Sequence, residues 1–359
     1  MEYGAIDLHK KQSQIRILTA GGDVIEDRRI VTARERFTAV FGLRRPMRIL
    51  VEASTESEWV ARHLETLGHE VIVADPNYLP MYGDRSRRVK TDRRDVAALA
   101  DACRRAVYRA AYRRSDQQRA VQAQLRVRQG LVNTRTRAIS LARSLMRASG
   151  HHIRSGESAS FLQRLAACEV PNDLTAILAP LRGVIEVVND ELASADTRFA
   201  ALVENDPVIK RLTTLPGIGP LTASAFVAAL DDVNRFRGAK AASQVTSYLG
   251  LVPREFSSGE RQHRGHLVRS AQPQVQTLLV QAAWRVRRST RSETAALRDW
   301  ADRVSRRRGK NIATVALARR LARILFAMWR DEVDYQPRRI HANRQSQAAT
   351  TEQPVARAV

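Results

Sequence analysis

Short apolar runs and helical apolar periods alternate along the N-terminal part of the chain. Continuous or alternating apolar runs predict strands, and apolar positions three and four apart predict helices. Turn residues such as Ala20-Gly21-Gly22-Asp23 separate the first strands. The predicted elements are, in order, a strand at 3–8, a strand at 13–18, a strand at 24–31, a helix at 33–42, a strand at 48–52, a helix at 57–68 and a strand at 71–74.

This order of elements predicts the class of the first domain. Three meander strands followed by strand, helix and strand are typical of the ribonuclease-H-like α/β fold. In that fold the first and fourth strands lie side by side, so Asp7 in the first and Glu52 at the end of the fourth would meet near the carboxyl ends. The period of two in a strand lets both side chains point to one face of the sheet.

Helical patterns dominate the rest of the chain. A basic loop at 75–91 leads into a helix that starts at Asp92. Long apolar periods at 115–150 and 174–204 predict a helical hairpin, which either packs on the first domain or forms an arm that dimerises and grips nucleic acid. The polar tail from Arg338 predicts disorder. Further helices are predicted at 221–230, 238–248, 272–288, 292–303 and 311–330.

Charge narrows the class of partner. The 359 residues include 60 Lys and Arg against 37 Asp and Glu, and the sequence pI is about 11.2. Residues 81–155 alone carry 19 Lys and Arg against 5 Asp and Glu. This clustering makes a nucleic acid, with its phosphate backbone, the leading partner.

Cysteine use and hydropathy predict a cytoplasmic protein with no membrane contact. Cys103 and Cys168 form no Cys-x-x-Cys pair, so neither a zinc site nor a disulfide framework is expected. The N-terminus enters a strand pattern directly, without a signal peptide. The apolar stretch at 312–329 contains arginines and predicts an amphipathic helix.

Four carboxylates on three segments are the candidate catalytic residues: Asp7, Glu52, Asp92 and Asp95. Asp7 lies inside a strand, where aspartate is disfavoured, and Asp92 and Asp95 are three apart on one side of a helix. Buried carboxylates repel one another unless a cation neutralises them. We therefore predict a Mg²⁺ site, with Mn²⁺ as the alternative ion, that acts on phosphodiesters.

Each carboxylate also has a simpler explanation when it is taken alone. Asp92 could be a helix N-cap, Asp95 could be a first-turn charge favoured by the helix dipole, and Glu52 could end its strand in solvent. Four neighbouring residues are metal-ligand candidates of lower rank: His9, Glu56, Glu58 and Asp75.

Candidate nucleic-acid contacts come from three segments. The first is the basic loop with the helix start that follows it. The second is the turn 215–220, whose glycines would expose backbone N–H groups at a helix N-terminus, unless the turn is an ordinary cap. The third is the polar loop 254–265. The candidates are Arg85, Arg87, Arg88, Lys90, Arg93, Arg94, Gly217, Gly219, Arg261 and Arg264.

The loop 254–265 also contains a serine pair, Ser257 and Ser258, followed by Gly259. Serine beside glycine is common in turns, so an ordinary polar loop is one interpretation. The other is a hydroxyl nucleophile held near phosphates by the arginines of the same loop.

Several of these segments occur together in one known family. They are Ile6-Asp7-Leu8-His9-Lys10, Val51-Glu52-Ala53-Ser54, Lys90-Thr91-Asp92-Arg93-Arg94-Asp95, Leu215-Pro216-Gly217-Ile218-Gly219-Pro220 and Tyr248-Leu249-Gly250-Leu251-Val252-Pro253, with Ser257-Ser258-Gly259 after them. With these segments in this order, the chain resembles the DEDD transposases of the one-ten insertion-sequence family over residues 3–335.

The resemblance implies a domain layout and residue roles. The layout is a RuvC-like DEDD catalytic domain at 1–112, a long helical connector at 113–206, a mainly α C-terminal transposase domain at 207–335 and a disordered tail at 336–359. The four carboxylates would bind Mg²⁺. Ser258, with Ser257 as the alternative, would be the nucleophile that becomes joined to a DNA 5′ phosphate.

The resemblance also implies a bacterial, nucleoid-associated protein and a set of partners. They are DNA at the element ends and at the target, and a structured guide RNA encoded by the element itself. A homodimer or homotetramer would let the serine of one subunit complete the acidic site of another. Two alternatives remain open: a hydrolytic metal-dependent nuclease or Holliday-junction resolvase without a covalent intermediate, and a non-catalytic nucleic-acid-binding protein.

Overall fold

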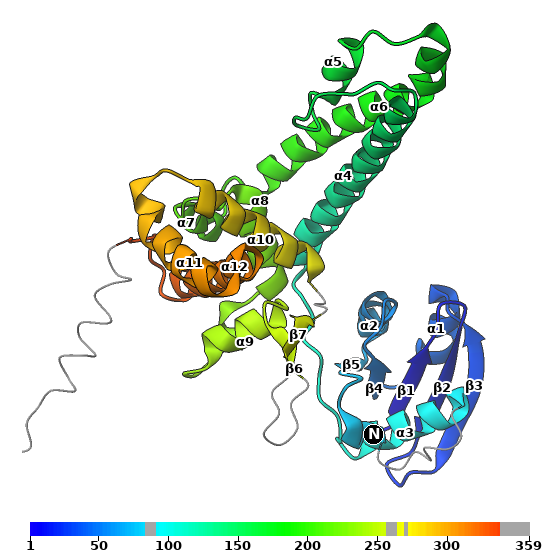
Figure 1. Cartoon of the computed structure of the whole chain (residues 1–359). Helices are drawn as coiled ribbons and strands as arrows, with labels where there is room; N and C mark the ends of the chain where they lie inside the picture. The colour runs from blue at the N-terminus through cyan, green and yellow to red at the C-terminus, as the bar shows by residue number, and fades with distance from the viewer. Residues whose placement is uncertain (83–90, 256–263, 269–271, 338–359) are drawn as a thin grey trace, which may run out of the picture. The chain divides into compact units, whose positions relative to one another are not determined.

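The computed structural model describes residues 1–82, 91–255, 264–268 and 272–337. The chain divides into two compact units, Met1–Arg114 and Ser115–Val359 (Figure 1). A division of the second unit into a connector and a C-terminal domain at residue 206 stays a prediction, and the predicted disordered tail lies outside the described residues.

The first unit is a mixed α/β structure, as the apolar pattern predicts. All seven predicted strands and helices are present, with ends that differ by no more than a few residues. The elements are β1 Tyr3–Leu8, β2 Gln12–Leu18, β3 Val24–Val31, α1 Arg34–Phe41, β4 Arg48–Glu52, α2 Ser57–Thr66, β5 Glu70–Ala74, the 3-10 turn η1 Leu79–Tyr82 and α3 Asp92–Arg104.

These strands form one sheet in the order β3-β2-β1-β4-β5. β1 is antiparallel to β2 and parallel to β4, with Ile6 opposite Val51. The first and fourth strands are therefore neighbours, as predicted. The more specific RuvC-like identity of this domain stays a prediction.

Strand alternation sorts the side chains of the sheet onto two faces. Ile6 and Val51 pack with residues of α1 and α2 in one apolar core. Ala5 and Leu50 belong to a second core on the opposite face, which is formed with residues of α3. Cys103 is fully buried in this second core, and its burial raises the pKa of the thiol to about 12. Cys103 and Cys168 are both free.

The second unit is mainly helical. Its main elements are α4 Asp116–Ala148, α5 Phe161–Ala166, α6 Asn172–Val203, α7 Pro207–Thr213, α8 Pro220–Leu230, α9 Ala241–Tyr248, β6 Pro253–Glu255, β7 Arg264–Leu267, α10 Pro273–Arg288, α11 Ala295–Arg308 and α12 Lys310–Arg330.

The predicted helical hairpin is confirmed as the pair α4 and α6, which run side by side, with α5 at their far end (Figure 1). One apolar core joins α4, α5 and α6 near that end. A larger core joins the other end of the pair to α7–α12, through residues such as Leu125 of α4 and Phe199 of α6.

The apolar pattern misses four elements of the second unit: α5, α7, β6 and β7. Each is seven residues or shorter, which is too short for a period to stand out in the sequence. In the part of the chain that is described, no helix is both long and apolar enough to cross a membrane.

Candidate metal centre

The sheet places two of the four candidate carboxylates on the same face. Asp7 shares the strand parity of Ala5, and Glu52 shares that of Leu50, so both side chains lie on the face that α3 covers. Asp7 directly follows Ile6, and Glu52 directly follows Val51, which is the residue opposite Ile6. The two carboxylates therefore lie at adjacent positions near the carboxyl ends of β1 and β4.

The other two candidates lie in the first turn of α3. Thr91 is the N-cap of this helix, because its side chain accepts a hydrogen bond from the backbone N–H of Arg94. The alternative interpretation of Asp92 as the N-cap is therefore wrong, and the Asp92 carboxylate does not cap the helix. Asp95 is buried in the same turn.

A histidine links the two segments. His9 Nε2 lies 3.4 Å from Asp7 Oδ2 and 3.5 Å from Asp92 Oδ1. Asp7, His9 and Asp92 each offer one ligand atom in a group where these atoms all lie within 4.8 Å of one another. The sequence ranks His9 low because a lone histidine usually packs in a core, but its side chain is 54% exposed.

Arg29, which the sequence does not single out, also contacts this group of residues. Asp7 is opposite Gln14, and Gln14 is opposite Arg29, so Arg29 lies two strands away from Asp7 in the same row. Arg29 Nη2 donates to Asp92 Oδ2 at 2.6 Å. This bond holds one oxygen of Asp92, while the other oxygen is the one near His9.

The other three carboxylates lie near enough to Asp7 for their charges to act on it. The pKa of Asp7 is raised above its ordinary value, first by burial and then by the negative charges of Asp92, Asp95 and Glu52, while His9 lowers it. Glu52 is half-buried, and its Oε2 accepts a hydrogen bond of 2.7 Å from the Tyr82 hydroxyl. The expectation that Glu52 simply ends a strand in solvent is therefore wrong.

The donor set fits a divalent cation that prefers oxygen ligands. Carboxylate oxygens suit Mg²⁺ and Mn²⁺, and an imidazole nitrogen at the same site adds a ligand that transition metals accept. Burying a carboxylate and placing others near it are both unfavourable without positive charge, and the raised pKa of Asp7 reflects first its burial and then its carboxylate neighbours. A bound dication would reverse it.

The remaining candidates near the sheet have other partners. Asp75 pairs with Arg109, Glu58 pairs with Arg62 and Arg113, and Glu56 accepts a hydrogen bond from Trp59. These contacts account for the three carboxylates without a metal.

Arg93 and Arg94 are exposed residues at the start of α3. Arg93 Nε lies 3.2 Å from an oxygen of Asp27. The loop candidates Arg85, Arg87, Arg88 and Lys90 lie outside the described residues.

Ser257, Ser258 and Arg261 lie outside the described residues, as does the side chain of Arg264. The flanking residues form an antiparallel pair of short strands, β6 and β7, with Pro253 opposite Leu267. The segment that contains the serines therefore joins the two strands of a hairpin.

The glycine turn lies directly before α8. Gly219 is the N-cap of this helix, and Gly217 has a φ of +90°, which favours glycine. The Gly217 carbonyl accepts a hydrogen bond of 3.3 Å from Arg285 Nη1.

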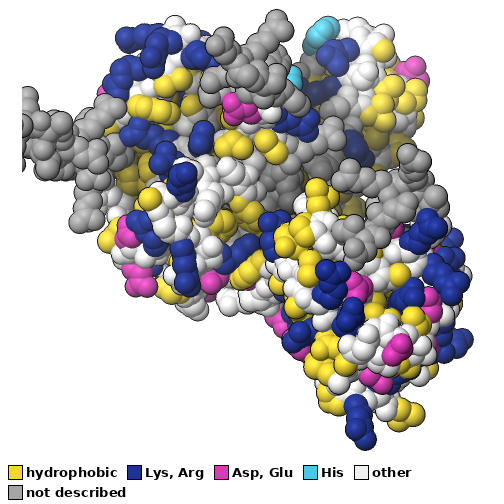
Figure 2. Space-filling view, turned by 90° about the horizontal axis from the view of Figure 1, so that it is seen from below, with side chains coloured by type: hydrophobic (Ala, Val, Ile, Leu, Met, Phe, Trp, Pro, Cys, Tyr) yellow, Lys and Arg dark blue, Asp and Glu magenta, His cyan; other side chains and the backbone are white. Residues whose placement is uncertain are grey.

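On the face drawn in Figure 2, Lys and Arg side chains spread over much of the surface, and Asp and Glu form smaller groups among them.

Comparisons with known proteins agree over most of the chain. Residues 5–149 match the DEDD transposase family model, described as "Transposase", and residues 209–298 match the "Transposase IS116/IS110/IS902 family" model. A probable family 20 transposase of Pseudomonas aeruginosa is 32% identical over 92% of this chain and 98% of its own length. The transposase for insertion sequence element IS1111A of Coxiella burnetii is 26% identical over 90% of this chain and 88% of its own length.

Proposed function

Because the chain belongs to the IS116/IS110/IS902 family of transposases, we propose that it cuts and rejoins insertion-sequence DNA through a covalent Ser258 intermediate. The family makes the chain a DNA-processing enzyme. The single observation that carries the proposal is the meeting of Asp7, Glu52 and the first turn of α3 on one face of the sheet. That arrangement supports a site for a divalent cation.

In this proposal Asp7, Glu52, Asp92 and Asp95 hold Mg²⁺, with Mn²⁺ as the alternative. The ion would stabilise negative charge on the scissile phosphate and orient it. Arg29 holds one oxygen of Asp92, and Tyr82 holds one oxygen of Glu52, so both carboxylates are oriented before DNA binds. His9 lies where it could complete the ligand set.

The proposed chemistry has two displacements at phosphorus. In the first, the Ser258 oxygen bonds to phosphorus, the bond to the 3′ oxygen breaks, and the serine proton ends on the departing 3′ hydroxyl. In the second, a different 3′ hydroxyl attacks the serine–phosphate ester and releases Ser258, which regains a proton. Two easier steps replace a single difficult one, and the ester conserves the bond energy, so no ATP is needed.

Partners follow from the same proposal. DNA at the element ends and at the target would be the substrate, and a structured guide RNA from the element would choose the sequences by base pairing. A homodimer or homotetramer would bring the serine of one subunit to the carboxylates of another. The basic surface supports binding to the backbones of either nucleic acid.

The test is adduct formation by the purified full chain with Mg²⁺, guide RNA and element DNA, followed on a denaturing gel. We expect wild type and Ser257→Ala to form a protein–DNA adduct, and Ser258→Ala to form neither adduct nor exchanged strands. Loss with Ser257→Ala instead would assign the nucleophile to Ser257.

Two other outcomes would favour the alternatives. Full cleavage by Ser258→Ala without an adduct would indicate a hydrolytic nuclease or resolvase. DNA binding by wild type without cleavage or adduct would leave a non-catalytic binding protein.

A further inference from the structure

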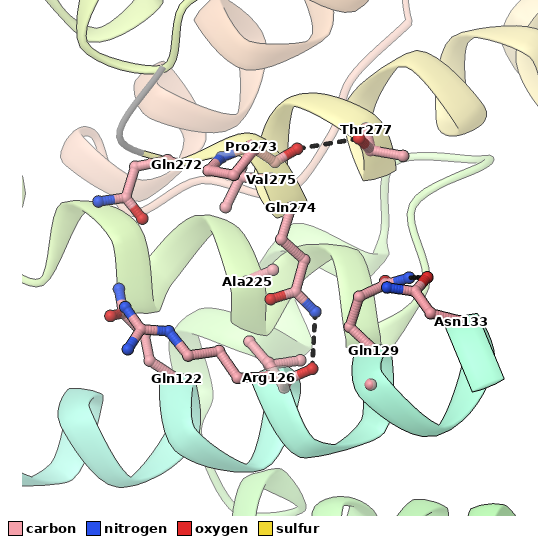
Figure 3. Close-up of a pocket in the computed structure, with 12 residues that line it drawn as sticks. Gln122, Arg126, Gln129, Asn133, Ala225, Gln272, Pro273, Gln274, Val275 and Thr277 are labelled. Carbon is pink, nitrogen blue, oxygen red and sulfur yellow. Dashed lines mark hydrogen bonds between the residues drawn. The ribbon is translucent and has the colours of Figure 1, made fainter. Parts of the chain in front are cut away.

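A cavity of about 560 Å³ lies in the second unit, between α4, α8 and the start of α10 (Figure 3). The residues that line it on α4 include Gln122, Arg126, Gln129 and Asn133. None of them belongs to the carboxylate cluster, which lies wholly in the first unit. Cavities of this size bind small molecules or parts of larger ones.

Five of the twelve residues that line the cavity carry side-chain amides, and two of these amides are held in place by helix carbonyls. Gln122 Nε2 donates to the Ala228 carbonyl at 2.8 Å. Gln274 Nε2 donates to the Leu125 carbonyl at 2.8 Å (Figure 3). Each bond uses one N–H of an amide that also has a second N–H and a carbonyl oxygen. Gln129 Nε2 also donates to Asn133 Oδ1 at 2.9 Å (Figure 3), so four of the five amides are held in defined orientations.

Arg126 adds a positive charge to the residues that line the cavity. Its side chain is exposed, and among the described residues it forms no ion pair. Other arginines of the same helix do have partners: Arg128 pairs with Asp196, and Arg135 donates to Asn189. No acidic side chain of the described residues lines the cavity. A guanidinium in this setting favours an anion, such as a phosphate group.

Gly130 lines the cavity on α4 and, having no side chain, leaves open space there. It lies in the interior of a helix of 33 residues, where glycine costs about 1 kcal/mol relative to alanine. A Cβ atom added there would meet no heavy atom within 4 Å. Packing therefore does not require the glycine, and a larger side chain at this lining position would take up space in the cavity.

We propose that this cavity binds one unpaired nucleotide of a single-stranded nucleic acid. The amides would pair with the edge of the base, as Asn and Gln do with adenine, and Arg126 would hold the phosphate. Leu125, Pro273 and Val275 give the lining an apolar part against which the base can lie. A duplex would not fit this role, because its bases are stacked and each would have to leave the stack to enter a cavity.

The inference rests on the proposed function only in its choice of a nucleic-acid partner. The test therefore measures binding without catalysis, by fluorescence anisotropy of short single-stranded RNA and DNA probes without divalent ions. Raised salt reduces sequence-independent contacts elsewhere on the chain. We compare Gly130→Leu and Arg126→Ala with two matched controls.

The controls are Gly183→Leu and Arg137→Ala. Gly183 is also inside a long helix with no atom near its added Cβ, and Arg137 is an exposed arginine of α4; neither residue lines the cavity. We expect each cavity variant to weaken binding about tenfold, the scale of one lost base or phosphate contact. Each control should change the affinity less than twofold.

The two probes distinguish the source of the nucleotide. Loss of affinity confined to RNA would assign the cavity to an RNA strand, loss confined to DNA would assign it to a displaced DNA strand, and loss with both supports either source. Unchanged binding of both probes by the cavity variants, or equal losses in the controls, would overturn the proposal. Failure of the proposed function would appear separately, in the adduct assay.

Discussion

At the scale of single residues, Asp7 is the carboxylate whose ionised form is unfavourable in the folded, metal-free protein. Its side chain is only 13% exposed, and burial together with three neighbouring carboxylates raises its pKa. A carboxyl whose folded pKa lies above its unfolded value favours folding when protonated, and this contribution is lost as pH rises through the folded pKa. At neutral pH, ionised Asp7 therefore destabilises the metal-free protein.

We predict that Asp7→Asn stabilises the metal-free protein at pH 7, because the raised pKa of Asp7 makes its ionised form unfavourable in the folded state. The same variant should lose DNA cleavage. Urea unfolding in the presence of a chelator measures the first effect.

Asp75→Asn is the matched control. The backbone N–H of Asn77 and the Arg109 side chain lower the pKa of Asp75, so its loss should destabilise the fold. If both variants moved stability in the same direction, the charge argument at Asp7 would be wrong.

At the scale of elements, the glycine turn before α8 depends on close packing. Gly217 has a φ of +90°, and a Cβ atom there would lie 2.7 Å from Val286 Cγ2 of α10. Gly219, two residues on, has a φ of −98° and no heavy atom within 4 Å of its added Cβ. The two glycines therefore serve different purposes.

Gly217→Ala should destabilise the protein by about 2 kcal/mol, because strain at positive φ and overpacking against Val286 add together. Gly219→Ala should cost less than about 1 kcal/mol, since only an N-cap preference is lost. Thermal unfolding of the two variants side by side checks this, and equal shifts would contradict the assigned packing.

Sequence patterns predict the sheet and the long helices because their apolar periods span a whole element. They miss β6 and β7, which have three and four residues with no clear alternation. They also cannot decide whether Thr91 or Asp92 caps α3, since both are good cap residues next to each other.

The meeting of Asp7 with Glu52 follows from strand parity and is therefore visible in the sequence. The contacts of Arg29 and Tyr82 are not, because they depend on the register of β3 and on the path of η1 across the sheet. His9 can be found from its parity with Asp7, but sequence alone does not separate a ligand from a packed histidine.

At the scale of the whole molecule, the formal charge of +23 is the property that most affects binding to nucleic acids. Two units share this charge, and each has its own core. Binding that neutralises many phosphates releases counterions, so the affinity falls steeply with salt.

We predict that DNA affinity of the full chain falls by a factor of about a thousand between 50 and 200 mM salt, as expected for roughly six phosphate contacts. Filter binding over a salt series gives the slope. A slope near zero would show that phosphates contribute little and that the charge serves another purpose.

The account depends most on a divalent cation held by carboxylates from β1, β4 and α3. An anomalous difference map from crystals soaked in Mn²⁺ tests this directly, because the metal is located without reference to activity. We predict a peak bounded by Asp7, Glu52 and Asp92 that is absent in Asp7→Asn crystals soaked in the same way. A well-ordered wild-type site without a peak, or Mn²⁺ bound only elsewhere, would contradict the account.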